Sequence, residues 1–300
     1  MTRTIGVDVG GTKVAAALVD GDGHVQTRAR RSSASRDYQG LLDAVTGTVE
    51  EAAAGESVDA VGLAIAGNVT ADGSSVLFSP HLPLSGEPLQ VDLQNRLGCP
   101  VTVDNDANAA AWAEFQFGSH GATDDLLLVA VGTGIGAGIV IGGALYRGSN
   151  GFAGEAGHMT VVRDGRVCPC GSRGCWERYA SGTALLAAYL ERGGNPELGG
   201  PDITTAALAG DGTAREALTD IGDWLGRGLS SLVAVVDPGA VIVGGGVSEA
   251  GALLLDPALK AFRSNLTGRG RRPEPAITAA RLGVDAGVIG AAALAGHHVK

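Results

Sequence analysis

One pattern, a strand, a glycine turn, a second strand and a second glycine turn, occurs twice in this chain of 300 residues. The first copy, TIGVDVGGTKVAAALVDGDG, begins at Thr4, and the second, LLLVAVGTGIGAGIVIGGALYRG, begins at Leu126. In each copy, two apolar runs of strand length are separated by glycines that permit a tight bend. The copies agree in layout rather than in letters. This layout predicts two α/β domains of similar topology, each opening on a β-hairpin.

The rest of the sequence supplies further strands and helices for both domains. We expect strands in HVQTRARR, VDAVGLAIAG, PVTVDND and GAVIVGGGVS. Apolar periodicity predicts helices over 38–54, 107–115, 181–191, 203–209, 214–236 and 285–297. We place the domain boundary near 117–125, which gives a first domain over 1–117 and a second over 118–284. The last apolar helix, about 285–300, is expected to return and pack on the first domain.

Composition and charge limit the class of protein. The chain has 45% hydrophobic residues, 18% charged residues and 49 glycines, which favours a soluble α/β protein over a disordered or fibrous one. It contains neither the roughly 18 consecutive apolar residues of a membrane helix nor a secretory signal pattern, so we expect a cytoplasmic protein. A formal net charge of −10 argues against nucleic acid as a partner. The basic run over 268–275 is interpreted as a solvated loop, and the first strand begins too early for a preceding helix-turn-helix.

Three glycine turns follow apolar strands, at 10–13, 132–136 and 244–246. Glycine allows backbone N–H groups to approach an anion closely, although each turn alone could be no more than a tight bend. Two of the turns also contain threonine, and the first ends in Lys13, so both offer further donors to phosphate oxygens. Asp8, just before the first turn, could hold Mg²⁺ through water. Together these features indicate a bound triphosphate, but none of the turns has the spacing of a P-loop.

A group of polar side chains stands where the strand PVTVDND passes into a helix. A carboxylate at a helix N-terminus tends to remain ionised, which suits a general base that takes a proton from an attacking hydroxyl. Asp104 or Asp106 could equally do no more than cap the helix. The residue types alone do not separate these two interpretations.

Three of the four cysteines lie within eight positions, in CPCGSRGCWE. A reducing compartment argues against a disulfide, and pairing would leave one of the three over. Cys168, Cys170 and Cys175 could instead bind a metal, with His158 as the fourth ligand of a closed, tetrahedral Zn²⁺ site. Cys99 stands far from the group and is expected to behave as a small buried hydrophobic residue.

Five motifs, in this order, resemble those of the ROK family of sugar kinases, and most closely its ATP-dependent members that act on glucose: DVGGTK, VDNDANAAAWAE, VGTGIGAGIVI, GEAGHM and CPCGSRGCWE. The similarity runs over nearly the whole chain. It implies the actin-like or hexokinase-like ATPase fold, which is ribonuclease H-like, with two α/β domains around a central cleft. It also implies three cofactors: ATP, Mg²⁺ and a structural Zn²⁺.

The resemblance also implies roles for individual residues. Asp106 matches the family's catalytic base, whereas Asp104 stands where members carry various residues and is assigned no chemistry. The matching sugar-binding positions are Gly67, Asn105, Asp106, Glu155, His158 and Glu177. The matching nucleotide-binding positions are Asp8, Gly10, Gly11, Thr12, Lys13, Gly132, Thr133, Gly134 and Gly245. The matching zinc ligands are His158, Cys168, Cys170 and Cys175. Without the resemblance, Glu155 and Glu177 would be interpreted as solvated surface acids. Gly67 and Gly245 could equally be no more than turns after buried strands.

We therefore expect ATP-dependent phosphorylation of glucose to glucose 6-phosphate, by a homo-oligomer that is a dimer or a tetramer. One alternative is a kinase for another hexose, such as fructose, mannose or an N-acetylhexosamine. A second is a sugar-sensing repressor without enzymatic activity, which the family also contains. An actin-like filament or chaperone ATPase is a third, although the cysteine cluster would have no purpose there.

Overall fold

The computed structural model of the chain describes residues 2–32, 37–118 and 123–299, and these form two compact units. Unit 1 consists of Met1–Ser119, Gly138–Gly154 and Arg281–Lys300, and unit 2 of His120–Ala137 and Glu155–Ala280. The units differ from the domain ranges expected from the sequence chiefly in residues 138–154, which belong to unit 1. Residues 119–122, within the expected boundary region, lie outside the described residues.

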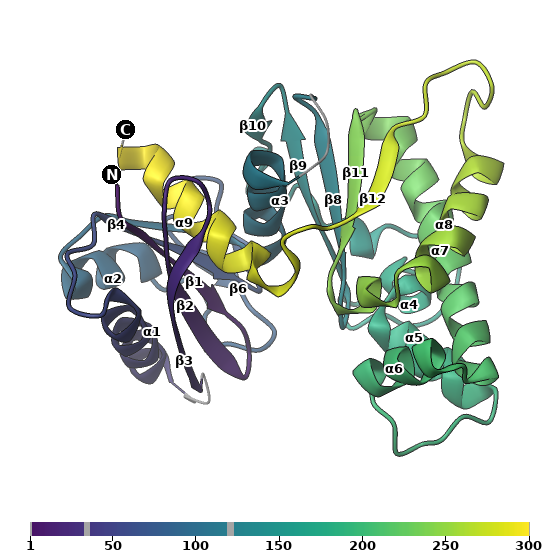
Figure 1. The fold of residues 1–300 in the computed structure, drawn as a ribbon, viewed down its shortest axis with the longest axis horizontal. Coiled ribbons are helices and arrows are strands. Elements are labelled where there is room, and N and C mark those ends of the chain that lie inside the picture. Colours follow the sequence, from purple (N-terminus) through teal and green to yellow (C-terminus); the bar gives the residue numbers. More distant parts are fainter. Residues whose placement is uncertain (1, 33–36, 119–122, 300) are drawn as a thin grey trace. The chain divides into compact units, whose positions relative to one another are not determined.

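Unit 1 is built on a five-stranded sheet with the order β3-β2-β1-β4-β7 (Figure 1). Its strands are β1 (Thr4–Val9), β2 (Lys13–Val19), β3 (Val25–Ser32), β4 (Ala60–Ile65) and β7 (Val101–Asn105). β2 pairs antiparallel with β1 and β3, whereas β1, β4 and β7 run parallel to one another. A short hairpin, β5 (Asn68–Val69) and β6 (Val76–Phe78), follows β4. The antiparallel pair β1–β2 is the hairpin expected from the first copy of the repeated pattern, and it is confirmed.

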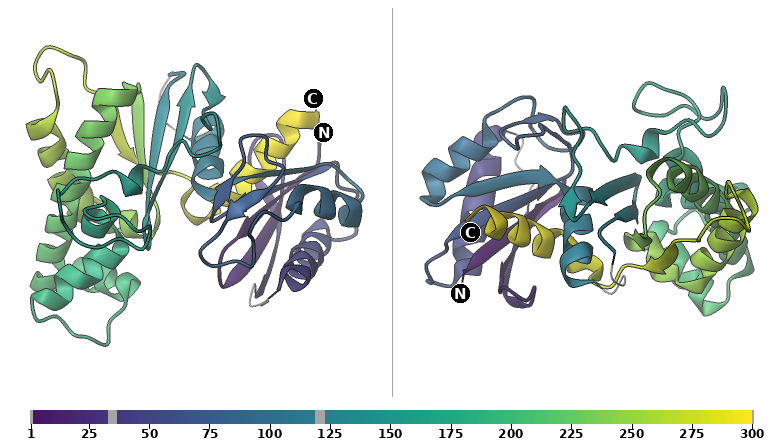
Figure 2. Two further views of the ribbon diagram at one scale, coloured as in Figure 1. Left: turned by 180° about the vertical axis from the view of Figure 1, so that it is seen from behind. Right: turned by 90° about the horizontal axis from the view of Figure 1, so that it is seen from above.

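Helices cover both faces of this sheet. One face packs on α1 (Tyr38–Ala53) and α2 (Leu89–Leu97) through a core that includes Ile5 and Val7. The other face packs on α9 (Ala286–Val299), and α3 (Asp106–Phe117) packs against α9 (Figure 2). Since α9 is the last helix and belongs to unit 1, its expected return is confirmed.

Glycines make the close approach of α9 possible. Gly6 in β1 and Gly62 in β4 point toward this helix. A Cβ atom at Gly6 would lie 1.7 Å from the carbonyl oxygen of Val288, and one at Gly62 would lie 1.8 Å from that of Ala291. Neither position has room for a methyl group, so the sheet and helix meet backbone to backbone.

The second sheet has the order β10-β9-β8-β11-β12. Its strands are β8 (Leu126–Val131), β9 (Ile135–Ile141), β10 (Ala144–Leu145), β11 (Ala240–Gly244) and β12 (Ala276–Ala279). If the five strands of each sheet are numbered in the order in which they occur along the chain, both sheets have the spatial order third, second, first, fourth, fifth. The similar topology expected from the repeated pattern is confirmed.

The helices of unit 2 are α4 (Glu177–Ala180), α5 (Gly182–Glu191), α6 (Gly200–Ala209), α7 (Gly212–Val236) and α8 (Ala252–Asn265). Short 3₁₀ turns are η1 (Ala156–His158) and η2 (Gly246–Ala250), with η3 (Gly283–Asp285) in unit 1. α7 and α8 lie side by side and form the most extensive helix pair (Figures 1 and 2). The sequence did not predict α2, α8, β12 or the β5–β6 hairpin.

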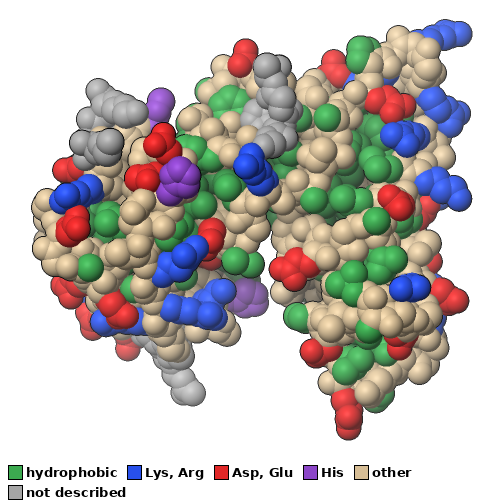
Figure 3. All heavy atoms as spheres, viewed as in Figure 1, with side chains coloured by type: hydrophobic (Ala, Val, Ile, Leu, Met, Phe, Trp, Pro, Cys, Tyr) green, Lys and Arg blue, Asp and Glu red, His purple; other side chains and the backbone are tan. Residues whose placement is uncertain are grey.

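The surface is charged but mixed in sign. On the face shown in Figure 3, acidic and basic side chains are interspersed. The basic run over 268–275 lies between α8 and β12 and contains neither helix nor strand, so it is a loop, as expected. Arg272 in this loop forms an ion pair with Asp237. Among the described residues, no helix has both the length and the apolar character needed to cross a membrane.

Candidate active site

The end of β7 and the start of α3 bring three of the expected site residues together in unit 1. The side-chain Oδ1 of Asn105 accepts hydrogen bonds from the backbone N–H groups of Ala107 and Asn108, at 2.9 and 3.2 Å. Its Nδ2 donates to the carbonyl oxygen of Gly67 at 3.1 Å. Asn105 is thus the helix cap, rather than Asp104 or Asp106 as the capping interpretation held. Among the described residues, one N–H of its amide is left for a ligand.

Asp106 is the first residue of α3 and is half-buried. Its Oδ1 accepts a hydrogen bond from the backbone N–H of Ala107 at 2.9 Å. The N-terminal end of a helix dipole favours a negative charge, so this position stabilises the carboxylate form. A carboxylate held there can accept a proton.

The first glycine turn joins β1 to β2 and is closed by a hydrogen bond from Gly10 N–H to the carbonyl oxygen of Lys13, at 2.9 Å. Thr12 and Lys13 are exposed, so their donors are accessible to an anion. Gly11 must lack a side chain, because a Cβ there would lie 2.7 Å from the Cβ of His81. Burial raises the pKa of the Asp8 carboxyl, and the charge of Lys13 partly opposes this shift.

The second glycine turn joins β8 to β9 in unit 2, and the start of α5 supports it from behind. Gly182 N–H donates to the carbonyl oxygen of Gly132 at 2.7 Å, and Thr183 Oγ1 donates to that of Thr133 at 2.7 Å. Thr183 was not expected from the sequence, because it is far from the turn along the chain. The third turn packs against the end of β8: Gly245 has φ +82° and leaves no space for a Cβ beside Val131.

The four expected zinc ligands form one cluster in unit 2, and their ligand atoms all lie within 4.8 Å of one another. The sulfur atoms of Cys170 and Cys175 are 3.6 Å apart, and Cys168 Sγ is 3.7 Å from His158 Nδ1. Tetrahedral zinc with Zn–S bonds of about 2.3 Å and a Zn–N bond of about 2.0 Å requires S···S near 3.8 Å and S···N near 3.5 Å. The geometry therefore fits a tetrahedral Zn²⁺ with Nδ1 as the histidine ligand.

The three thiols of the cluster differ in their surroundings. Burial raises the pKa of Cys168 and of Cys175, whereas a backbone hydrogen bond from Ser172 lowers the pKa of the exposed Cys170 to about 7. A bound metal ion would deprotonate all three thiols. Cys99 lies outside the cluster and packs against the core of unit 1, where it is half-buried rather than buried as expected.

Both expected sugar-binding glutamates lie beside this cluster. Glu155 Oε2 is 3.8 Å from His158 Nε2. Glu177 Oε1 lies 3.1 Å from Cys168 Sγ and 3.8 Å from His158 Nδ1. The other oxygen of Glu177 faces the glycine turn between β8 and β9, because a Cβ at Gly134 would lie 2.6 Å from Oε2. One carboxylate thus borders both the cysteine cluster and the glycine turn.

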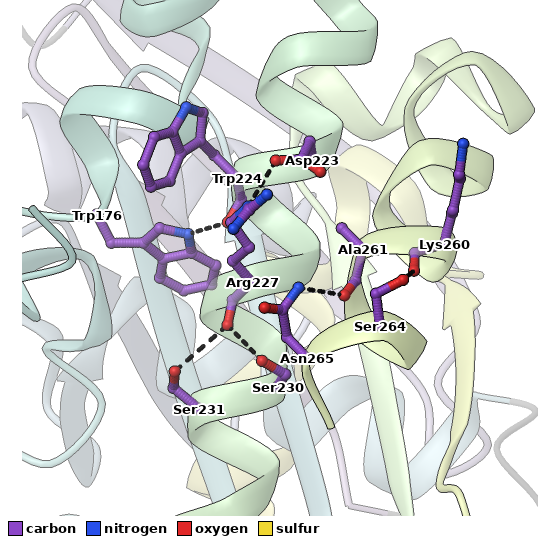
Figure 4. A network of polar contacts seen from close by, with 10 residues as sticks. All are labelled: Trp176, Asp223, Trp224, Arg227, Ser230, Ser231, Lys260, Ala261, Ser264 and Asn265. Atoms are coloured by element: carbon purple, nitrogen blue, oxygen red, sulfur yellow. Dashed lines mark hydrogen bonds and ion pairs between the residues drawn. The ribbon is translucent and has the colours of Figure 1, made fainter. Parts of the chain in front are cut away.

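Trp176, between the last cysteine and Glu177, anchors this region and was not singled out from the sequence. It is fully buried, and its indole N–H donates to the carbonyl oxygen of Trp224 at 2.8 Å, on α7 (Figure 4). Gly228, one turn further along α7, leaves the space that the indole ring fills. Serines 230 and 231 both donate to the carbonyl oxygen of Arg227 in the same network. The burial of a tryptophan directly before Glu177 fixes the start of α4.

The expected site residues thus form two groups, one in each unit. Unit 1 holds the Gly67–Asn105–Asp106 group and the turn from Asp8 to Lys13, and unit 2 holds the cysteine cluster, both glutamates and the turns at Gly132–Gly134 and Gly245. Two sheets of the same strand order, each with a glycine turn after its first strand, constitute the actin-like or hexokinase-like ATPase fold.

Within that class, the ROK family profile matches residues 4–298, and the chain belongs to this family. A glucokinase of Streptomyces coelicolor is 41% identical over 98% of each chain. A crystal structure of a ROK family glucokinase from Streptomyces griseus, in complex with glucose and AMPPNP, has a TM-score of 0.90 and 43% identity, and covers 98% of this chain and 99% of that one. A putative xylose repressor of Caldicellulosiruptor is 40% identical over 65% of this chain and 52% of its own length.

Proposed function

We propose that this protein is a kinase that transfers the γ-phosphoryl group of ATP to a hydroxyl of glucose and forms glucose 6-phosphate. The observation that carries the proposal is the junction of β7 and α3, where Asn105 and Asp106 lie side by side on a rigid helix start. The similarity to two Streptomyces glucokinases over 98% of the chain supports glucose and ATP as the substrates.

In this proposal Asp106 is the general base. It takes the proton of the sugar hydroxyl while that oxygen bonds to the γ-phosphorus and the bond to the β,γ-bridging oxygen breaks, so that ADP leaves. Asn105 donates its remaining amide N–H to a sugar hydroxyl, and Gly67 fixes the amide. General-base assistance is worth about 10²- to 10⁴-fold in rate, and orientation of the reactants supplies much of the rest.

The remaining residues bind and orient the two substrates. Glu155, His158 and Glu177 accept or donate hydrogen bonds to sugar hydroxyls, and rigid carboxylates can discriminate between epimers. The turns at Gly10–Lys13 and Gly132–Gly134 offer backbone and side-chain donors to the phosphates, and Gly245 borders the nucleotide. Asp8 would hold Mg²⁺ through water, and that cation would neutralise charge on the phosphates.

The zinc ion would be structural, held by His158, Cys168, Cys170 and Cys175. All four positions of a tetrahedral site are filled by protein atoms, so the ion has no open position for catalysis. Its effect on function would pass through Glu155 and Glu177, which border the ligand set.

Other parts of the proposal are supported less directly. A putative xylose repressor matches this chain over about half of the repressor's own length, so a sugar-sensing protein without enzymatic activity is the alternative from a different class. Glucose-dependent ATP turnover distinguishes a kinase from such a sensor. A cytoplasmic location, a dimeric or tetrameric assembly and the absence of a nucleic-acid partner stay predictions. Another hexose substrate is the close variant.

A coupled assay of glucose 6-phosphate formation with MgATP and glucose tests the proposal, with wild type and Asp106→Ala in parallel. We expect turnover in the wild type and a loss of at least about 10²-fold in the variant, with the fold retained. Fructose, mannose and N-acetylhexosamines in the same assay test the substrate. Substantial turnover by Asp106→Ala would remove the general-base role, and a folded wild type inactive on all these sugars would refute the kinase function.

A further inference from the structure

Asp104, the acid to which the sequence assigned no chemistry, is the centre of a fully bonded polar cluster. Its side chain is 3% exposed, and both carboxylate oxygens are in use. Oδ2 accepts from Nε of Arg147 at 2.8 Å and lies 2.7 Å from Nη2 of the same guanidinium. Oδ1 accepts from the backbone N–H of Asn105 at 2.8 Å and from Nδ2 of Asn108 at 2.9 Å. Such a carboxylate is held in one position, because each oxygen has two donors.

The cluster surrounds the start of α3. Asp104 is the residue immediately before Asn105, and Asn108 lies in the first turn of the helix. Asn108 is 3% exposed, and its Oδ1 has no hydrogen-bond partner among the described residues. A buried amide with an unsatisfied acceptor lowers stability, and the bond that Asn108 donates to Asp104 offsets part of that cost.

Arg147 links the start of α3 to the segment 147–154 and to β5, in the same unit. It begins the segment 147–154, which is closed by a hydrogen bond from Ala153 N–H to the Arg147 carbonyl oxygen at 3.1 Å. In the middle of this segment, Gly151 packs on the backbone of Val69 in β5, where a Cβ would lie 2.0 Å from the Val69 carbonyl oxygen. β5 directly follows Gly67, whose carbonyl oxygen accepts from Asn105.

These contacts form a closed ring. It passes from Asp104 through Arg147 and its segment to β5, and returns through Gly67 to Asn105. The steps that are not covalent are hydrogen bonds, an ion pair and a contact between backbone atoms, and the Arg147 side chain that carries the ion pair is 28% exposed. A ring of this kind restrains the orientation of Asn105 and Asp106.

We propose that Asp104 and Arg147 are a positioning pair that fixes Asn105 and Asp106 in the orientation needed for phosphoryl transfer. Neither residue touches substrate in this proposal, which rests on the kinase function argued above. The pair acts through the backbone N–H of Asn105 and through the segment 147–154. Breaking the Asp104–Arg147 pair should therefore lower kcat/KM for glucose and leave the affinity for nucleotide unchanged.

The test uses Arg147→Met and Arg147→Lys, because Arg147 is 28% exposed and tolerates substitution better than the buried Asp104. The matched control is Arg28→Met, which breaks the exposed ion pair with Asp285 in the same unit. Steady-state kinetics give kcat, KM for glucose and KM for MgATP. Hydrogen exchange of the amides of residues 105–108 in the zinc-loaded protein without substrates gives a second readout.

We expect Arg147→Met to lower kcat/KM for glucose by about 10- to 100-fold, since misplacement of a reacting group by about 1 Å costs up to about 10²-fold. KM for MgATP should stay within about twofold. Exchange at residues 105–108 should rise at least about tenfold, and Arg147→Lys should give a smaller loss because it keeps the charge but not the fork of donors. The control should match the wild type in both readouts.

Unchanged exchange at residues 105–108, or kcat/KM for glucose within about twofold of the wild type, would overturn the proposal. An equal rise of both KM values, with faster exchange throughout the unit, would also overturn it in favour of a merely structural ion pair. If Arg147→Met does not fold, the same criteria apply to Arg147→Lys. A wild type without activity on glucose would refute the proposed function alone, because the exchange experiment contains no substrate and still decides the positioning role.

Discussion

Replacement of Gly134 by alanine should weaken glucose use, although this glycine lies in the turn expected to bind phosphate. The backbone of Gly134 is not in the left-handed region, so alanine fits it without strain. The new methyl group would lie 2.6 Å from Oε2 of Glu177, whereas C···O contacts are comfortable at about 3.3 Å. The carboxylate must therefore move by about 0.7 Å.

Glu177 has little freedom to make this movement without cost. Its other oxygen lies 3.1 Å from Cys168 Sγ, and the preceding Trp176 is fully buried. Because displacement of a binding group by about 1 Å costs up to about 10²-fold, we expect Gly134→Ala to lower kcat/KM for glucose by about 10- to 100-fold. That range corresponds to about 1.4–2.7 kcal/mol.

The assay compares Gly134→Ala with Gly132→Ala in the same turn. A Cβ at Gly132 meets no protein atom within 4 Å, and its φ is also outside the left-handed region. We expect Gly132→Ala to raise KM for MgATP, because its methyl group points into open space beside the proposed phosphate site, and Gly134→Ala to raise KM for glucose. If both variants raise only KM for MgATP, the argument that Gly134 makes room for Glu177 is wrong.

Two further predictions concern the metal and the fold. Purified protein should contain about one zinc per chain by elemental analysis, and its removal by a chelator should weaken glucose binding before MgATP binding in calorimetric titrations; equal loss of both would contradict the assigned role. Gly62→Ala should lower the free energy of unfolding by about 2 kcal/mol or more in denaturant titrations, because its methyl group would overlap the backbone of α9. Gly21→Ala, whose methyl group meets no atom within 4 Å, is the control and should change stability by less than about 1 kcal/mol.

The hairpins and their glycine turns could be predicted from the sequence because both features are local. An apolar run and a glycine bend are visible within ten residues, and the repetition of the pattern indicated the common topology of the two sheets. α8 was not predicted, since Pro257 interrupts its sequence pattern. The helix is stabilised by packing against α7, where Gly222 leaves room for Pro257. A Cβ at Gly222 would lie 2.7 Å from Cγ of Pro257. β12 has four residues with mostly exposed side chains, so it shows no alternation to detect.

The candidate site shows the same division between local and distant features. The spacing of the cysteines predicted one cluster with His158, because three of the four ligands lie within eight positions and His158 lies ten positions before the first of them. Arg147 and Trp176 could not be found in this way, since their partners are a buried acid 43 positions away and a carbonyl group on a distant helix. Residues that support a site from behind carry no pattern of their own.

Under the proposed function, in which Glu177 binds the sugar, support of this kind would matter for specificity. This carboxylate lies between the cysteine cluster and Gly134, so the cluster and the glycine turn both limit where its oxygens can be. A carboxylate restricted from two sides cannot follow a sugar whose hydroxyl points in another direction, and an unpaired buried polar group is costly. Loss of either restraint should therefore increase the relative use of epimers of glucose, even where the activity on glucose falls.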